Sequence, residues 1–328
     1  MAVRTTTIRS SSVLIVHGRG FKPPARDLRE ISIAALRAGI ARDYPDQLGG
    51  FDNIKVALAY YGDLSNAILS GRGCQYDETL DIDDRRAALE ALRAISSRKG
   101  FGIRQYDCIP GKSAVPEFIA NFVSPACGAL RLTKALLSWL SPDFAEYLYA
   151  DSAYAEQVRE RVRSALCNLL DRGDRVMLLA HGTGSVVAYD VLWQLSHESQ
   201  YAGKYADAVV DTWVTLGSPL GDDAIRGRLL GHASEQKSFP KNVVHWNNLS
   251  AEDDYTCHDN TLADDFEKML QQRVISRVQD YCVYNLAARY GKSNPHSSVG
   301  YFVHPRLSKI IVDWADILTV KTDLIYTL

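Results

Sequence analysis

A group of small residues between two apolar runs is the first feature of the chain that could serve chemistry. The stretch from Val176 to Leu192, VMLLAHGTGSVVAYDVL, contains an apolar run, the triplet Gly182-Thr183-Gly184 and a second apolar run with helical spacing. This order is typical of a strand, a tight turn and a helix, a unit that commonly presents a serine nucleophile at its turn. Gly182 stands at the apex and has no side chain.

The chemistry that such a turn serves is acyl transfer, which needs several further groups. A base must take the proton of the nucleophile, an acid must orient the base, and two backbone N–H groups must stabilise the developing oxyanion. Three other stretches hold residues of these types: HGRG at 17–20, AEDDYTCHDNTLADDF at 251–266 and NPHSS at 294–298.

Apolar runs and helical periodicity predict the elements that carry these stretches. We expect strands near 13–16, 54–64, 175–182, 209–221 and 242–250, and helices over 27–43, 81–100, 125–149, 156–174, 185–198, 266–282 and 306–317. Nearly continuous apolar strands that alternate with helices predict an α/β fold, with a mostly parallel sheet covered by helices on both faces. We expect one domain over 1–328 with a helical insertion at 65–155, where strand patterns are missing.

Five stretches, taken in order, resemble the α/β-hydrolase superfamily, in particular its bacterial lipase and esterase-like members. VLIVHGRG resembles the strand that ends in His-Gly and helps to form an oxyanion hole, AHGTGSVVAYDVL the nucleophile elbow with its helix, and VTLGSPLG the strand end that follows the elbow. VVHWNNLSAEDDYTCHD and NPHSS resemble the segments that carry the acid and the histidine. Their order is that of the superfamily, and the resemblance covers most of the chain outside the insertion.

The resemblance implies a role for each matching residue. Gly184 matches the glycine after the apex, so Gly182 occupies the nucleophile position. His296 is then the base and Asp254 the acid, with Asp253 as the close alternative.

The same resemblance implies the oxyanion hole. Its N–H groups are expected in the turn around Gly18 and Arg19 and at Thr183. His17 is more typical of a residue that braces the turn than of a base, and His181, which precedes the apex, is expected to point away from the substrate.

Glycine at the apex leaves three explanations open. An elbow apex is strained, and glycine relieves that strain, so the fold tolerates the loss of the nucleophile. The chain is a natural pseudoenzyme that binds a ligand, a serine enzyme whose nucleophile has been replaced, or a protein in which His296 activates a water in the vacated space. The resemblance therefore implies an ester or lipid hydrolase lineage with little or no activity in this chain. The competing hypothesis is a non-catalytic ligand-binding or protein-interaction module.

The composition and net charge of the chain indicate which classes of binding partner to expect. The 328 residues are 46% hydrophobic and carry a formal net charge of -2, which gives no reason to expect a nucleic-acid or acidic-membrane partner. No segment approaches the ~20 apolar residues of a membrane span, and the apolar run near the N-terminus is too short for a signal peptide. We therefore expect a cytoplasmic protein with free thiols. The resemblance implies that its ligand is a small ester or lipid-like molecule. The oligomeric state stays open.

No cofactor or metal is expected. The acidic stretch matches neither a calcium loop nor a zinc helix, and GRG and GTG lack the phosphate-loop and dinucleotide patterns. Residues 129–140 contain Leu130, Leu136, Leu137 and Trp139 and are expected to form a helical lid over the cleft, with ordinary core packing as the equal alternative.

Overall fold

A six-stranded sheet forms the centre of the molecule. The computed structural model describes residues 9–110, 141–150, 152–205, 208–234, 237–257 and 261–323. The strand order is β2-β1-β3-β4-β5-β6, and every pairing between neighbours is parallel. The strands are β1 (Ser11–Val16), β2 (Lys55–Ala59), β3 (Arg175–His181), β4 (Val210–Leu216), β5 (Val243–Ala251) and β6 (Arg277–Val283).

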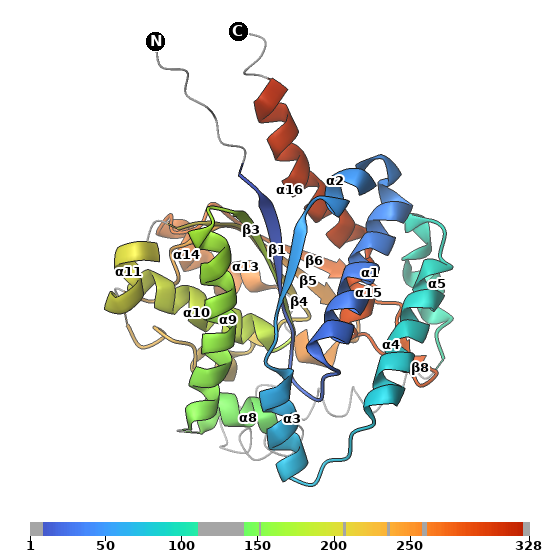
Figure 1. Cartoon of the computed structure of the whole chain (residues 1–328), viewed down its shortest axis with the longest axis horizontal. Helices are drawn as coiled ribbons and strands as arrows, with labels where there is room; N and C mark the ends of the chain where they lie inside the picture. Colours follow the sequence, from blue (N-terminus) through green and yellow to red (C-terminus); the bar gives the residue numbers. More distant parts are fainter. Residues whose placement is uncertain are drawn as a thin grey trace.

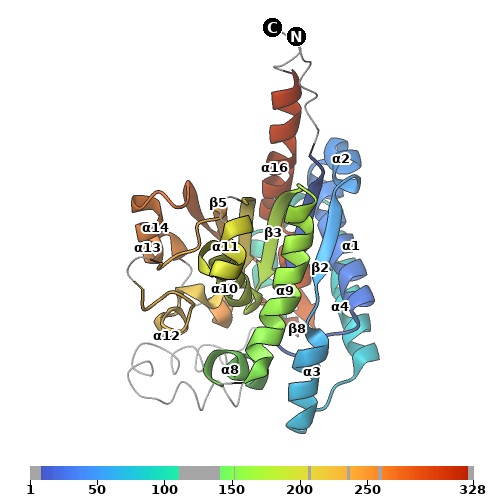
Figure 2. The same cartoon turned by 60° about the vertical axis from the view of Figure 1, so that its left-hand side comes forward.

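Helices cover both faces of this sheet (Figures 1 and 2). One face carries α1 (Ala25–Asp43), α15 (Ser298–Val303) and α16 (Pro305–Asp323), with α4 (Glu78–Arg93) against α1 and α15; the other carries α9 (Ala153–Asp171) and α10 (Gly184–His197). The shorter elements are α2 (Leu48–Asp52), α3 (Gly62–Gly71), α5 (Ile103–Asp107), α8 (Pro142–Tyr149), α11 (Ser199–Tyr205), α12 (Asp223–Arg226), α13 (Leu262–Asp265), α14 (Glu267–Gln271) and the hairpin β7 (Ala288–Arg289) and β8 (Lys292–Ser293).

The sequence of β1 shows why both faces must be covered. Val13 and Ile15 pack with α1, α15 and α16, whereas Leu14 and Val16 pack with α9 and α10, and all four are buried. Successive side chains of a strand point to opposite faces, so an unbroken apolar run requires two apolar layers. The predicted α/β fold with helices on both faces of a parallel sheet is confirmed.

The prediction of a helix over 266–282 is wrong. That segment holds only the short helix α14, followed by the edge strand β6, which pairs with β5. Of the seven residues of β6, only Val283 is buried. An edge strand that is buried so little has no continuous apolar run, so its sequence carries no clear strand signal. The predicted loop before the final helix also contains α15.

The strand order predicts a ligand site at one end of the sheet. The chain moves from β1 to β2 on one side and then returns to β3 on the other side of β1. In open parallel sheets, ligands bind outside the carboxyl ends of the strands where the order reverses. The residues that follow β1 and β3, His17 and Gly182, therefore lie at the expected place for a site.

The predicted insertion at 65–155 stays a prediction. Its described parts are helical, in α3, α4, α5, α8 and the start of α9. The proposed lid helix at 129–140 lies outside the described residues. None of the helices in the described ranges combines the length and apolar character needed to cross a membrane.

Candidate active site

The turn after β3 has the backbone expected of an elbow. Gly182 has a φ of +55°, in the left-handed region that favours glycine. Its N–H donates to the carbonyl of Leu216 at 2.8 Å, and its own carbonyl accepts from the N–H of Ser185 at 3.0 Å. A Cβ at Gly184 would clash with the carbonyl of His17, so glycine lets the start of α10 approach the end of β1.

His296 and Asp254 lie in direct contact. Nδ1 of His296 is 3.0 Å and 2.9 Å from the two carboxylate oxygens of Asp254. The Asp254 side chain is fully buried, and 15% of the His296 side chain is exposed. Because an ionised carboxylate only accepts hydrogen bonds, Nδ1 carries the hydrogen and leaves Nε2 as the acceptor.

Two further donors fix the carboxylate. The hydroxyl of Tyr301 donates to Asp254 at 2.8 Å, and the N–H of Thr256 donates at 3.0 Å. Burial alone would raise the pKa of Asp254, but the facing His296 and these hydrogen bonds outweigh it and hold the pKa at about 2. Asp254 is therefore ionised at neutral pH and can orient His296.

The other ring nitrogen of His296 faces the apex of the elbow. A Cβ built on Gly182 would lie 2.9 Å from Nε2 of His296 and 3.1 Å from its Cε1. The expected contacts of His296 with Asp254 and with Gly182 are therefore both present, although their catalytic roles stay predictions. The imidazole partly fills the space that a side chain at Gly182 would take.

The neighbouring aspartate points elsewhere. Asp253 has a φ of +59°, and its carboxylate accepts from the hydroxyl of Tyr106 at 2.7 Å. Of the two aspartates that the sequence left open, Asp254 is the one that contacts His296.

Two of the residues expected to form an oxyanion hole, Gly18 and Thr183, lie beside Gly182. A Cβ on Gly18 would be 3.5 Å from the backbone nitrogen of Thr183, and a Cβ on Gly182 would be 3.9 Å from Cα of Gly18. Within the described part of the chain, the N–H groups of Gly18 and Thr183 make no hydrogen bond. The side chain of Arg19 donates to the hydroxyl of Tyr255 at 3.0 Å, next to His296.

Lys22, which the sequence analysis missed, holds this turn in place. Its Nζ donates to the carbonyls of Arg19, of Gly20 at 3.2 Å and of Phe21 at 3.3 Å, while the N–H of Gly20 donates to Asp143 at 2.8 Å. Burial and, next, the charge of Arg85 lower the pKa of Lys22 to about 7. No sequence pattern signals a lysine that binds the carbonyls of its own turn.

Gly217 and Tyr301 were also missed. Gly217 follows β4 with a φ of +58°, and a Cβ there would lie 2.6 Å from a carboxylate oxygen of Asp254. Only glycine leaves room for the carboxylate at this point. The available signal was a glycine near the end of the predicted strand, in the stretch VTLGSPLG.

The other two histidines of the site are buried and serve as braces. Nε2 of His17 accepts from the N–H of Tyr61 at 3.1 Å, and its Nδ1 contacts the carbonyl of Gly18 at 2.9 Å, as expected of a bracing residue. His181 lies against the ring of His296, at 4.5 Å between centroids, and its Nε2 donates to the backbone carbonyl of His296 at 2.9 Å.

Burial keeps His17, His181 and a third histidine, His304, neutral in the folded protein. We therefore predict that the free energy of unfolding falls as the pH is lowered. Mainly through burial, the pKa values of His17 and His304 fall to about 3, and that of His181 falls well below its usual value. Burial raises the pKa of Asp190 to about 6, which acts in the opposite direction. At His17, His304 and Asp190 together, the unfolded chain binds about one more proton than the folded chain near pH 5, so the free energy of unfolding should fall by about 1.4 kcal/mol per pH unit, and the lowered pKa of His181 makes the fall steeper.

Urea unfolding at pH values between about 7 and about 5 measures this slope. His304 lies away from the elbow and accepts from the N–H of Arg306 at 3.1 Å, a bond that asparagine can also accept. His304→Asn should reduce the slope by about 1.4 kcal/mol per pH unit. Equal slopes in the two proteins, or a flat profile in the parent, would contradict the assignment of neutral buried histidines.

The acidic stretch at 251–266 does not act as one group. Asp253 binds Tyr106, Asp254 binds His296, and Asp265 pairs with Arg226. His258 and Asp259 lie outside the described residues. Among the residues with described positions, no three histidine, cysteine or acidic side chains are grouped so that they could hold a metal ion.

A cavity of about 900 Å³ opens beside His296. Near the elbow its wall includes His17, Arg19, His181 and Tyr255, and its other wall is formed by α4 and the β7–β8 hairpin. Its size is in the range of small-molecule sites.

No protein-family model, curated protein or solved structure matches the chain.

Proposed function

We propose that this chain descends from α/β-hydrolases that cleave carboxylic esters, and that Gly182 stands where a Ser-His-Asp site would have its serine. The observation that carries the proposal is the position of Nε2 of His296, 2.9 Å from a Cβ built on Gly182. A base oriented by a buried carboxylate, beside the apex of an elbow, is the arrangement that activates a serine hydroxyl.

The groups around the elbow support the same proposal. The N–H groups of Gly18 and Thr183 lie next to Gly182, where they could stabilise an oxyanion, and Lys22 holds the Gly18 turn through its carbonyls. The ligand in this proposal is a small carboxylic ester, and this chain turns it over slowly or not at all because it has no nucleophile.

A non-catalytic binding protein is the second candidate. It is favoured by Gly182 itself, since the cavity beside His296 persists without the side chain that chemistry would need. Both candidates keep the cavity as the ligand site, and they differ in whether the rest of the site can still activate a nucleophile.

Covalent labelling tests the proposal without knowledge of the substrate. A fluorophosphonate reacts with a serine that is activated by a histidine. Gly182→Ser should take up one equivalent of the probe at residue 182, seen by mass spectrometry of the intact protein and its peptides. The parent and Gly182→Ser/His296→Ala should take up none. A folded Gly182→Ser protein that stays unlabelled would refute the proposed lineage.

A further inference from the structure

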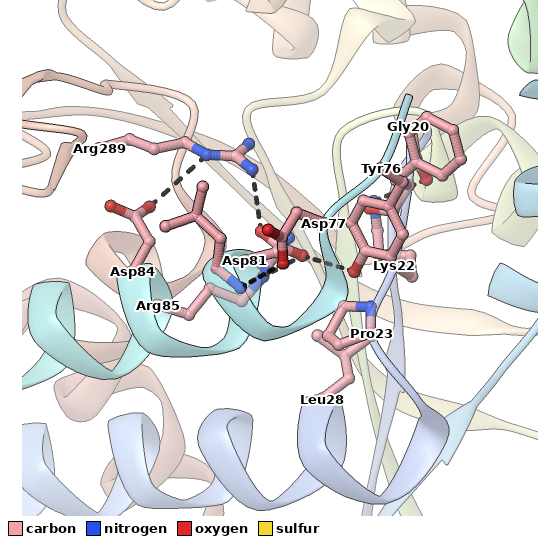
Figure 3. Close-up of polar contacts among 12 residues, drawn as sticks. Gly20, Lys22, Pro23, Leu28, Tyr76, Asp77, Asp81, Asp84, Arg85 and Arg289 are labelled. Carbon is pink, nitrogen blue, oxygen red and sulfur yellow. Dashed lines mark hydrogen bonds and ion pairs between the residues drawn. The ribbon is translucent and has the colours of Figure 1, made fainter. Parts of the chain in front are cut away.

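The wall of the cavity opposite the elbow is built from paired charges. Asp81 on α4 is buried and accepts hydrogen bonds from three side chains: Tyr76 at 3.0 Å, Nε of Arg85 at 3.1 Å and Arg289 at 2.9 Å. Arg289 also pairs with Asp84 at 3.5 Å. Figure 3 shows the network, with Arg85 and Tyr76 reaching Asp81 and Arg289 lying over Asp81 and Asp84.

This network retains unused hydrogen-bonding capacity next to the cavity. Arg85 and Arg289 line the cavity. Their contacts to Asp81 use Nε of Arg85 and one terminal nitrogen of Arg289. Within the described part of the chain, the terminal nitrogens of Arg85 make no hydrogen bond. A guanidinium held in place by a buried carboxylate is a preorganised donor for a ligand oxygen.

The charges on this wall decide against three kinds of ligand. An alkyl chain would strip water from carboxylates and guanidinium groups and give no hydrogen bond in return, which is costly. A simple anion would meet Asp77, Glu78 and Asp84, and a simple cation would meet Arg85 and Arg289. A neutral ligand with many hydroxyl groups avoids these costs, because each hydroxyl both donates and accepts.

Aromatic rings flank the charged network. Phe21 and Tyr76 both line the cavity and stack on each other with centroids 4.6 Å apart, and Tyr290, also on the cavity wall, is 56% exposed as a residue. Aromatic faces beside hydrogen-bonding groups suit the alternating C–H and O–H surfaces of a sugar ring.

We propose that the α4 side of the cavity binds a sugar, so that the ester presented to His296 is an acylated sugar. This inference rests on the proposed function for the ester, but the sugar subsite can be tested without catalysis. The elbow side of the same cavity, at His296, then receives the acyl ester.

Binding to the parent protein tests the subsite, because a chain without a nucleophile turns the ester over slowly or not at all during a titration. The probes are a mono-acetylated methyl glucoside and hexyl acetate, compared by calorimetric titration. The acetylated sugar should bind with a Kd about ten-fold or more below that of hexyl acetate. Equal or tighter binding of hexyl acetate would overturn the inference.

Two neighbouring arginines on α4 give a matched pair of variants. Arg85→Met keeps an apolar stem but removes the guanidinium, and it should weaken binding of the acetylated sugar by about ten-fold while leaving hexyl acetate unchanged. Arg86 instead pairs with Asp27 at 3.1 Å and does not line the cavity, so Arg86→Met should change neither. Equal losses in the two variants would also overturn the inference.

Tyr290→Ala tests the subsite through a second residue in case Arg85→Met does not fold. Tyr290 is largely exposed, so its loss should not disturb the fold. The substitution should weaken sugar binding by about three-fold with an unchanged melting temperature; unchanged binding would count against the subsite. If Gly182→Ser is labelled by the fluorophosphonate but the parent does not prefer the acetylated sugar to hexyl acetate, the sugar subsite alone is refuted. Sugar binding that depends on Arg85, without labelling, would refute the hydrolase proposal alone.

Discussion

Gly182→Ser is expected to hydrolyse p-nitrophenyl acetate and butyrate between about 10³-fold and about 10⁶-fold faster than the parent. The upper value is the typical cost of losing the nucleophile from an intact Ser-His-Asp site. His296, oriented by Asp254, already faces the apex, and Thr183 follows it. The hydroxyl of a serine, carried on a new Cβ, would then complete the set.

The lower value allows for the adjustment that serine requires. The new Cβ would lie 2.9 Å from Nε2 of His296, so the ring must retreat by a few tenths of an ångström while Asp254 still holds Nδ1. A side chain at a φ of +55° costs a further ~1–3 kcal/mol, which lowers the melting temperature without unfolding a domain of this size.

Gly182→Ala is the matched control for this experiment. It introduces the same Cβ and the same backbone strain without a hydroxyl, so it should show the melting temperature of Gly182→Ser and the activity of the parent. Gly182→Ser/His296→Ala should also be inactive. Activity that survives the loss of His296 would mean that a different group is the base.

Asp254→Asn, made in the Gly182→Ser protein, is expected to reduce kcat by up to about 10⁴-fold, with the activity of the parent as the floor, because an amide no longer orients the ring as the carboxylate does. An asparagine carbonyl can still accept from Nδ1–H, but it carries no charge to stabilise the imidazolium. The measurement is kcat with p-nitrophenyl butyrate at neutral pH, where the low pKa of Asp254 keeps the carboxylate ionised in the parent site.

The adjacent residue supplies the control. Asp253→Asn makes the same chemical change one position away, where the side chain accepts from Tyr106 rather than contacting His296. Asparagine tolerates the positive φ of this position and can still accept from that hydroxyl. Its kcat should stay within about three-fold of Gly182→Ser. A large loss in Asp253→Asn, with Asp254→Asn active, would exchange the two roles.

Much of the fold was predictable from local patterns. The apolar runs of β1 and β3 and the helical spacing of α1, α9 and α10 lie within contiguous segments, so the sequence alone indicates the elements and their alternation. The elbow was instead expected from the resemblance, and the φ of +55° at Gly182, in the region that favours glycine, is compatible with it. Strand β6 was missed because an edge strand lacks an apolar run.

The candidate site could be predicted only in part. The resemblance implied Gly182 and His296 as site residues and left Asp253 as an alternative to Asp254, because neighbouring aspartates have the same chemistry. The backbone decides between them: a positive φ at Asp253 directs that carboxylate to Tyr106, and the next residue faces His296. Such a choice depends on the direction of a loop, which no local pattern specifies.

Contacts between distant segments account for what only the tertiary structure decided. Tyr301 reaches Asp254 across 47 positions of the chain, and Asp143 reaches the N–H of Gly20 across 123. The polar wall on α4 likewise forms only when Arg289 reaches Asp81, 208 positions away. The sequence by itself determined the elements and the types of reactive group, because periodicity and backbone preference act within a few residues. The tertiary structure decided which groups meet and what lines the cavity, because those contacts form only when the sheet brings separate loops to one edge.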